Sequence, residues 1–286
     1  MAVLRRFTTD KLAAISCSVL VLTLMFGLMA PWIAPHDPYA VHIDLRYASA
    51  SWSYPLGNDH LGRCIMSRLI YGIRPSVIWV LAALFLSVGI GALAGFVAGY
   101  YRGKVDAVLM RLCDIVLSFP AYVTTLAVVG LLGVGLTHIL IAFILVKWAW
   151  FARVIRTAVM QYADMEYVKF SKAIGTHDAV IMIRHLVPVA TPDIAVLASS
   201  AMGSMILQIS GLSFLGLGIQ APQAEWGMML NEARAVMFTR PELMLAPGLA
   251  ITVVVSAFHF LSDALQIALD PRQVSSNRAG RREIAK

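Results

Sequence analysis

The sequence has little charge. Only 14% of its 286 residues are Asp, Glu, Lys or Arg, whereas 59% are apolar, and the mean hydropathy is +0.76. A soluble domain carries roughly 25% charged residues. So few charges could not cover the solvated surfaces of a chain this long, which excludes an ordinary soluble protein. We therefore expect the apolar excess to face lipid.

Cysteine and catalytic motifs are also scarce. Cys17, Cys64 and Cys113 are odd in number and form no CxxC pair, so they indicate no disulfide framework. No GxxxxGK[ST] sequence is present, and the chain alone is not expected to hydrolyse ATP. GxSxG and HExxH motifs are missing too. We predict a non-enzyme with no catalytic residues, cofactor or bound metal.

Four side chains before the second apolar run could still offer nitrogen and oxygen ligands to a metal. They are His36, His42, Asp59 and His60. Their spacing matches no closed metal site, so they are interpreted as scattered surface residues.

Six apolar runs are each long enough to form a helix across a bilayer, which takes about 20 residues. They lie at about 12–34, 76–99, 113–133, 137–157, 194–215 and 245–268. The first exceeds the apolar core of a cleaved signal peptide, so we expect it to be retained. The predicted fold is an all-α integral membrane protein with six transmembrane helices.

Lys and Arg are distributed unequally between the two sides of this arrangement. Of 23 such residues, sixteen fall in the two terminal segments and the second and fourth connections, six fall on the other side, and Lys147 lies within a span. Short cytoplasmic connections hold the excess of basic residues. Both termini should therefore be cytoplasmic, and the net charge of +7 marks that side rather than a nucleic-acid site.

Two connections are too long to be simple turns: residues 35–75 outside and 158–193 inside. We divide the chain into an N-terminal span with its external loop (1–75), a core transmembrane domain (76–270) that includes residues 164–188 of the inner connection, and a cytoplasmic tail (271–286).

The inner connection has the pattern of a helix-turn-helix over residues 164–188. Asp164 is predicted to cap the first helix, with Glu166 in its first turn and Gly175 as its left-handed end. A second helix should be capped by Thr176 and end near Arg184 and His185, with Pro188 as its terminator. Such a unit could fit a groove on a soluble partner, although a solvated connector is the simpler alternative.

Glu166-Tyr167-Val168 through Gly175, followed by His185-Leu186-Val187-Pro188 and Pro192, resembles the EAA loop of ATP-binding-cassette importer permeases. The loop departs from the family at Phe170 and Ser171, where two alanines are usual.

The external loop resembles the same family. Pro55 through Arg63, then Ser67-Arg68 and Gly72-Ile73-Arg74, is similar to a signature of the C-type subunit of dipeptide, oligopeptide and nickel permeases, with Cys64 in place of an aspartate.

The resemblance implies a type I importer fold and a set of partners: a homologous second permease subunit, two ATP-binding subunits, an extracytoplasmic substrate-binding protein and the lipid bilayer. It also implies that the inner loop docks on the ATPase. The residues expected to couple the two are Asp164, Glu166, Tyr167, Val168, Ser171, Gly175, His185 and Pro188.

Cargo is indicated by resemblance alone. Trp148 through Arg153 and Ala224 through Arg234 look closest to permeases for nickel and for metal bound to opine metallophores of the staphylopine type. A dipeptide or oligopeptide importer is the alternative within the family. Outside it, a secondary transporter or a membrane scaffold remains open, although we find no inverted repeat or broken helix of the kind secondary transporters show.

Five polar residues lie in or near the spans, where ionisable groups suggest function. Lys147 either snorkels to the cytoplasmic interface or lines a pathway. Arg111 and Asp114, three residues apart, are expected to pair across a helical turn. His259 and Asp263 share a face of the sixth span, in a structural hydrogen bond or a substrate contact.

Overall fold

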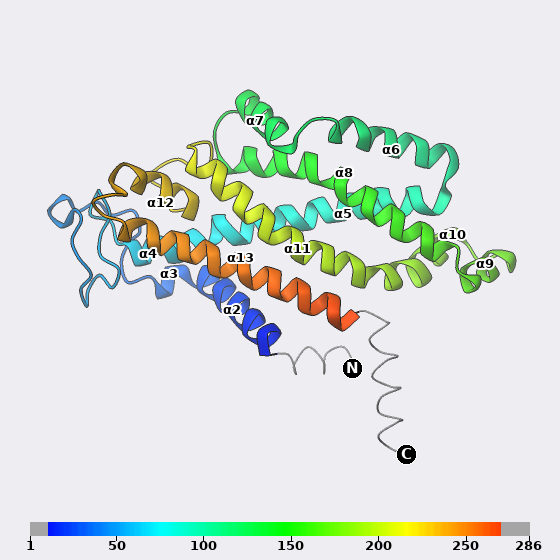
Figure 1. Cartoon of the computed structure of the whole chain (residues 1–286), viewed down its shortest axis with the longest axis horizontal. Helices are drawn as coiled ribbons and strands as arrows, with labels where there is room; N and C mark the ends of the chain where they lie inside the picture. Colours follow the sequence, from blue (N-terminus) through cyan, green and yellow to red (C-terminus); the bar gives the residue numbers. More distant parts are fainter. Residues whose placement is uncertain (1–10, 270–286) are drawn as a thin grey trace, which may run out of the picture.

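The computed structural model describes residues 11–269, and within that range it consists of helices and loops (Figure 1). Five helical segments are long and apolar enough to cross a membrane, and a bent pair supplies a sixth span. The expected all-α membrane fold is thus confirmed. The predicted tail, residues 271–286, lies outside the described residues.

The long helices run side by side and carry short helices at both ends (Figure 1). In chain order the elements are α2 (Lys11–Leu28), α3 (Ala30–Ile33), η1 (Ile43–Leu45), α4 (Ile65–Ile73), η2 (Arg74–Ile78), α5 (Trp79–Tyr101), α6 (Gly103–Leu117), α7 (Ala121–Leu132), α8 (Leu136–Ala163), α9 (Glu166–Ala173), α10 (Asp178–Ile181), η3 (Met182–Leu186), α11 (Val187–Phe214), α12 (Trp226–Ala233), η4 (Arg234–Val236) and α13 (Glu242–Leu269).

Glycines bring α5 and α8 into close contact. Gly91, Gly95 and Gly99 recur every fourth residue, so they share one face of α5. A Cβ at Gly95 would lie 2.8 Å from the carbonyl oxygen of Ala152, and one at Gly99 would lie 2.9 Å from that of Arg156. Only glycine permits this approach of two backbones, the usual route to tight helix packing in lipid.

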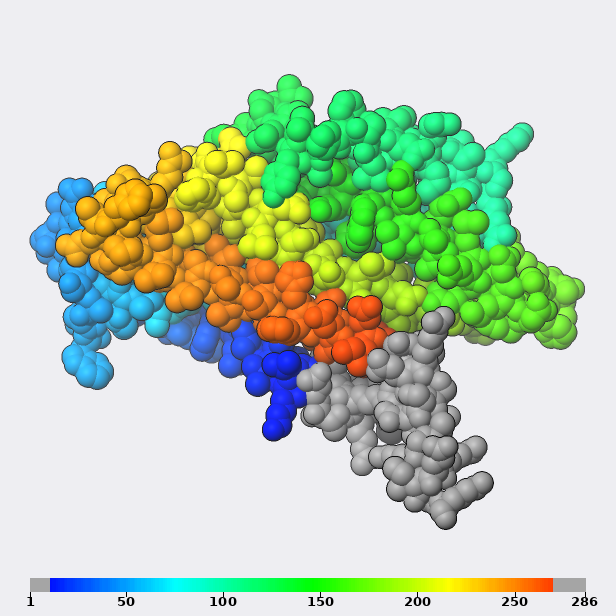
Figure 2. All heavy atoms as spheres, in the orientation of Figure 1, coloured from blue at the N-terminus to red at the C-terminus, as the bar shows by residue number. Residues whose placement is uncertain are grey.

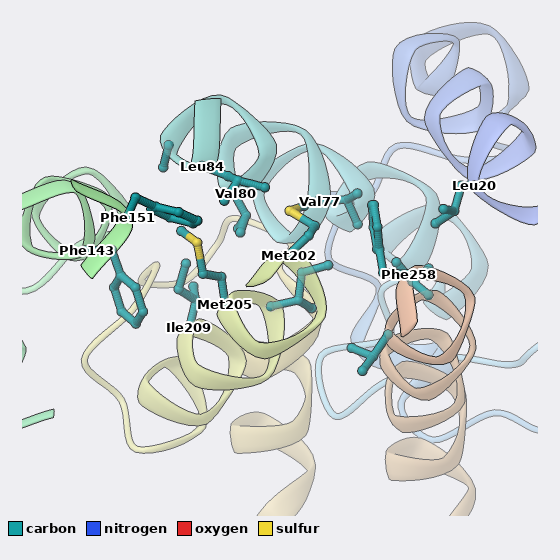
Figure 3. Packing of buried hydrophobic residues seen from close by; sticks show 14 of the residues in the cluster. Leu20, Val77, Val80, Leu84, Phe143, Phe151, Met202, Met205, Ile209 and Phe258 are labelled. Carbon is teal, nitrogen blue, oxygen red and sulfur yellow. The ribbon is translucent and has the colours of Figure 1, made fainter. Parts of the chain in front are cut away.

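The core is centred on α11. Met202, Met205 and Ile209 are each exposed by 1% or less. Figure 3 shows them between side chains of neighbouring helices, including Phe151 of α8 and Phe258 of α13. Methionine side chains adapt to such irregular interfaces, so the two methionines fill the spaces between helices.

The third span is not the single helix predicted over 113–133. The chain forms α6 and α7 instead, which are bent by 78° relative to each other at a short break. Pro120 causes the break because it lacks an N–H donor and disfavours helical backbone at the residue before it. Either α6 or α7 alone, at 15 and 12 residues, is too short to cross a bilayer.

Two helices continue through prolines by widening. Pro75 lies in η2, a π-helical turn between α4 and α5, so the helical segment is continuous over Ile65–Tyr101 and begins well before the predicted residue 76. Pro188 follows the π-helical turn η3 and lies in the first turn of α11. The prediction that Pro188 ends a helix is therefore wrong, because the segment Asp178–Phe214 is continuous and its π-helical turn widens the helix just before the residue that lacks an N–H donor.

Candidate functional site

The inner connection forms a protruding knob, residues 164–188. Its helices α9 and α10 lie beyond the end of α8, at the end of the molecule opposite α12 (Figures 1 and 2). Val168 and Ile181 are fully buried and hold it together, and Ser171 is nearly so. The predicted helix-turn-helix is present, and Gly175 has the expected left-handed backbone, with φ +82°.

Other coupling residues lie on the surface of the knob. The Glu166 side chain is 92% exposed and forms an ion pair with Lys169, at 3.1 Å. Tyr167 is partly exposed, with its ring centroid 5.9 Å from that of His185. Pro188 is also exposed. Phe170, absent from the predicted set, is 66% exposed, so it adds an apolar group to the surface of the knob.

The predicted caps are wrong. Asp164 ends α8 rather than beginning α9, whose N-cap position is held by Met165 without a side-chain hydrogen bond. Thr176 does not cap the second helix, because the His177 ring accepts the hydrogen bond from the Ala179 backbone N–H. In both cases the N-cap lies one position later than the polar residue that the sequence indicated.

Asp164 has a different role, which is to tie the knob to the corner between α5 and α6. Its carboxylate accepts a hydrogen bond of 2.8 Å from Arg102, which also donates to the Met160 carbonyl. The hydrogen bond from Arg102 holds the pKa of the Asp164 carboxyl below its usual range. The carboxylate is therefore ionised at neutral pH, as this tie requires.

Tyr100 makes a second tie between the knob and α5. Its hydroxyl donates a 2.6 Å hydrogen bond to Asp178 of α10. The Lys172 ammonium of α9 lies 4.1 Å from the centroid of the Tyr100 ring, within the range of a cation–π contact. One side chain of α5 thus contacts both helices of the knob.

The Arg111–Asp114 pair does not form. Asp114 pairs with Arg153 of α8, and Arg111 is exposed. Asp106 pairs in the same way with Arg156. These two ion pairs hold α6 against the inner half of α8. Sequence spacing could not indicate them because the partners lie 39 and 50 residues apart.

His259 and Asp263 are both exposed on α13, and neither hydrogen-bonds the other within the described residues. A Cβ at Gly203 of α11 would lie 3.0 Å from Nε2 of His259, so the imidazole rests on that glycine. Because His259 and Asp263 are exposed, we still expect them to contact the cargo or a neighbouring chain.

Lys147 lies deep within α8. It is 11 residues from Leu136 and 16 from Ala163, or about 16 Å and 24 Å along the helix. Its ammonium makes no hydrogen bond or ion pair with the rest of residues 11–269, and none of their carboxylates interacts with it electrostatically. A central cation costs about 2.5–3.5 kcal/mol on insertion scales.

At the opposite end of the molecule, two buried arginines share two carboxylates. Arg63 and Arg68 are each 1% exposed. Both bind Oε2 of Glu232, at 2.9 and 2.8 Å, and Arg63 also binds Asp59 at 2.6 Å. This outer ion-pair cluster joins the external loop and α4 to α12. Three of its four members belong to the motif by which the external loop resembles the permease family.

The structure brings Asp59 and His60 together with Glu232, a grouping the sequence did not predict. One ligand atom of each lies within 4.8 Å of the others. The adjacent cavity has a volume of about 20 Å³, room for little more than a water molecule. Because both carboxylates already bind guanidinium groups, the arrangement is that of an ion-pair network rather than a metal site.

Glu225 anchors α12 from a fully buried position. Its carboxylate accepts hydrogen bonds from the backbone N–H groups of Gly227 and Met228, at 2.9 and 2.8 Å. The Ser76 hydroxyl donates a third, at 3.1 Å. Burial raises the pKa of the Glu225 carboxyl above its usual range, and these donors oppose that rise. The result is a fixed joint between α12 and η2.

Comparisons with known proteins agree with this architecture. The family model described as binding-protein-dependent transport system inner membrane component matches residues 91–275. The model for the N-terminal TM domain of oligopeptide transport permease C matches residues 2–51.

Curated relatives match nearly the whole chain. The metal-staphylopine import system permease protein CntC of Staphylococcus aureus (strain Mu50 / ATCC 700699) is 55% identical over 278 residues, 97% of this chain and 96% of that protein. The nickel transport system permease protein NikC of Escherichia coli (strain K12) is 39% identical over 259 residues, 91% and 94% of the two chains. The glutathione transport system permease protein GsiD of Escherichia coli O6:K15:H31 (strain 536 / UPEC) is 37% identical over 270 residues, 94% and 89%.

These matches exclude the secondary transporter and the membrane scaffold that the sequence left open. The chain belongs to the family of binding-protein-dependent transport system inner membrane components, as a multi-pass permease subunit of an ATP-binding-cassette importer and not as an enzyme.

Proposed function

We propose that this permease forms half of the translocation pathway for a transition metal bound to an opine chelator of the staphylopine type, or for nickel. The observation that carries this cargo is the 55% identity to a metal-staphylopine permease over 97% of the chain, against 37% to a glutathione permease. A dipeptide or oligopeptide remains the alternative cargo.

The proposed assembly contains a homologous second permease subunit, two ATP-binding subunits and an extracytoplasmic substrate-binding protein. The knob would face the cytoplasm, as would both termini, and its exposed side chains would dock in a groove of the ATPase. Tyr167, Phe170 and Ile174 support this role because they leave an apolar surface exposed, by 41%, 66% and 64%, at the tip of the molecule.

Transport would proceed by alternating access. When ATP binding brings the ATPase subunits together, they would move the knob, and the knob would move α8, α11 and, through Tyr100, the end of α5. The cavity between the two permeases would then open toward the loaded binding protein, and hydrolysis would reset it. Such coupling requires contacts that differ between the two states.

Two experiments test this function. A Phe170→Cys variant in the complete importer should crosslink to the ATPase subunit, whereas Phe238→Cys, 89% exposed between η4 and α13 at the opposite end of the molecule, should not. Cells lacking this chain should lose uptake of radioactive nickel supplied with staphylopine, and the chain should restore it. Restoration of dipeptide uptake alone would refute the proposed cargo, and failure of Phe170→Cys to reach the ATPase would refute the docking role.

A further inference from the structure

The feature that the architecture leaves unexplained is Lys147, a cation in the middle third of α8. The basic residues that follow it on the same helix, Arg153 and Arg156, are both paired with aspartates of α6. Lys147 has no such partner within residues 11–269. A charge at this depth normally faces a water-filled cavity or an opposite charge.

The direction of the side chain argues against snorkelling to the cytoplasmic interface. In an α-helix each Cα–Cβ bond tilts toward the N-terminus of the helix. The N-terminus of α8 is Leu136, the end away from the knob. The Cα–Cβ bond of Lys147 therefore points away from Arg153 and the knob, toward the opposite end of α8.

The face of α8 on which Lys147 lies is turned toward α11 rather than toward lipid. Phe143 and Phe151, one turn before and one turn after it, are exposed by 3% and 0%. Figure 3 shows both rings directed toward Met205 and Ile209 of α11. The lipid-exposed Leu145, at 51%, lies roughly 160° away around the helix.

Lys147 is nevertheless only partly buried between these aromatic rings. No carboxylate of residues 11–269 pairs with its ammonium, so the charge is left for a group outside the described chain. A fixed cation in that position repels a bare divalent metal ion and attracts a carboxylate.

We propose that Lys147 is a cargo-binding residue that hydrogen-bonds a carboxylate of an anionic metal chelate during its passage. This rests on the proposed importer function and narrows its cargo: the metal crosses inside a carboxylate-bearing chelator, not as a free cation.

Accessibility to water is the first test, made in the complete importer with Cys17→Ala as background, since Cys64 and Cys113 are buried. Lys147→Cys should react with a charged, membrane-impermeant methanethiosulfonate reagent, and nickel with staphylopine should slow the reaction. Leu145→Cys is the matched control and should not react. A Lys147→Cys variant that stays unreactive would overturn the proposal, whether lipid or a carboxylate of a neighbouring subunit covers the site.

Uptake is the second test. Lys147→Met should reduce uptake of nickel supplied with staphylopine by about tenfold or more, the ratio that follows from losing one charged hydrogen bond. Lys147→Arg should retain most of it, and Lys104→Met, which removes an exposed cation of α6, should retain all of it. Membrane insertion should stay unchanged in each variant, and basal ATPase activity should stay unchanged in Lys104→Met. Equal uptake by Lys147→Met and the unchanged chain would overturn the proposal.

The two hypotheses fail differently. If the unchanged importer moves nickel neither as a free ion nor with staphylopine, the proposed cargo is wrong. If it moves the chelate and Lys147→Met moves it equally well, only the role of Lys147 is wrong.

Discussion

Replacing Gly95 of α5 with alanine should destabilise the permease by separating two helices that touch through their backbones. The new Cβ would lie 2.8 Å from the Ala152 carbonyl oxygen and 3.0 Å from the Arg156 amide nitrogen. Neither is the end of a flexible side chain, so α5 and α8 must move apart. Overpacking of this kind costs about 1–3 kcal/mol.

Gly89→Ala on the same helix is the matched control, because apart from its own turn of helix no atom of residues 11–269 lies within 4 Å of the position of its Cβ. That change removes the same glycine flexibility without a clash and should stabilise the helix by up to about 1 kcal/mol. The two variants should therefore melt at clearly different temperatures, by on the order of 2–4 °C for each kcal/mol.

The chain carries its own reporter for this measurement. Cys64 and Cys113 are buried, at 2% and 0% exposure, so a fluorogenic maleimide labels them only as the protein unfolds. Because Cys17 is partly exposed, both variants carry Cys17→Ala, and heating the detergent-solubilised proteins with this dye gives the melting temperature of each variant. Equal melting of Gly95→Ala and Gly89→Ala would show that the close approach of α5 and α8 does not contribute to stability.

Three further changes test the knob and the outer ion-pair cluster. Glu232→Gln leaves two buried guanidinium groups sharing one carboxylate, so it should lower the free energy of unfolding by about 3–5 kcal/mol and with it the melting temperature. Its control is Glu242→Gln, at a half-exposed ion pair, which should change that free energy by less than about 1 kcal/mol. Tyr100→Phe removes its hydrogen bond to α10 but keeps the ring beneath Lys172. In reconstituted importer it should lower nickel uptake per ATP hydrolysed severalfold without altering membrane insertion. An unchanged ratio of uptake to hydrolysis would show that the Tyr100–Asp178 hydrogen bond does not contribute to coupling. Gly175→Asp should uncouple hydrolysis from uptake more strongly than Gly175→Ala. Aspartate tolerates a left-handed backbone better than alanine, and apart from the chain neighbours of Gly175 no atom of residues 11–269 lies within 4 Å of the added Cβ. A larger effect of aspartate would therefore act at the surface proposed to face the ATPase. A stronger effect of alanine would place the defect in the backbone and not at the ATPase.

Hydropathy was enough to locate most spans because the requirement for about 20 apolar residues is local to each segment. The runs predicted at 137–157, 194–215 and 245–268 became α8, α11 and α13 with longer ends. The third run failed for an equally local reason, since hydropathy does not register the constraint that Pro120 places on the backbone before it.

Pairings between distant segments could not be predicted in this way. Arg63 and Arg68 meet Glu232 across 169 and 164 residues, and no periodicity in the sequence encodes that contact. The glycines of α5 are different, because Gly91, Gly95 and Gly99 recur at a spacing of four, which is a readable signal for close helix packing.

The continuity of α10, η3 and α11 changes how the knob would act on the membrane. A helix that ended at Pro188 would have attached the knob to α11 by a flexible joint, and the observed helical segment instead runs without a break over Asp178–Phe214. At the other side of the knob, α8 ends at Ala163, and Asp164 is held by Arg102. Under the proposed docking role, displacement of α10 would therefore move α11 directly, because the two belong to one helical segment. The side chains of α11 fill the core between α5, α8 and α13. Because such a core is close-packed, a movement of α11 would change its packing against each of these helices.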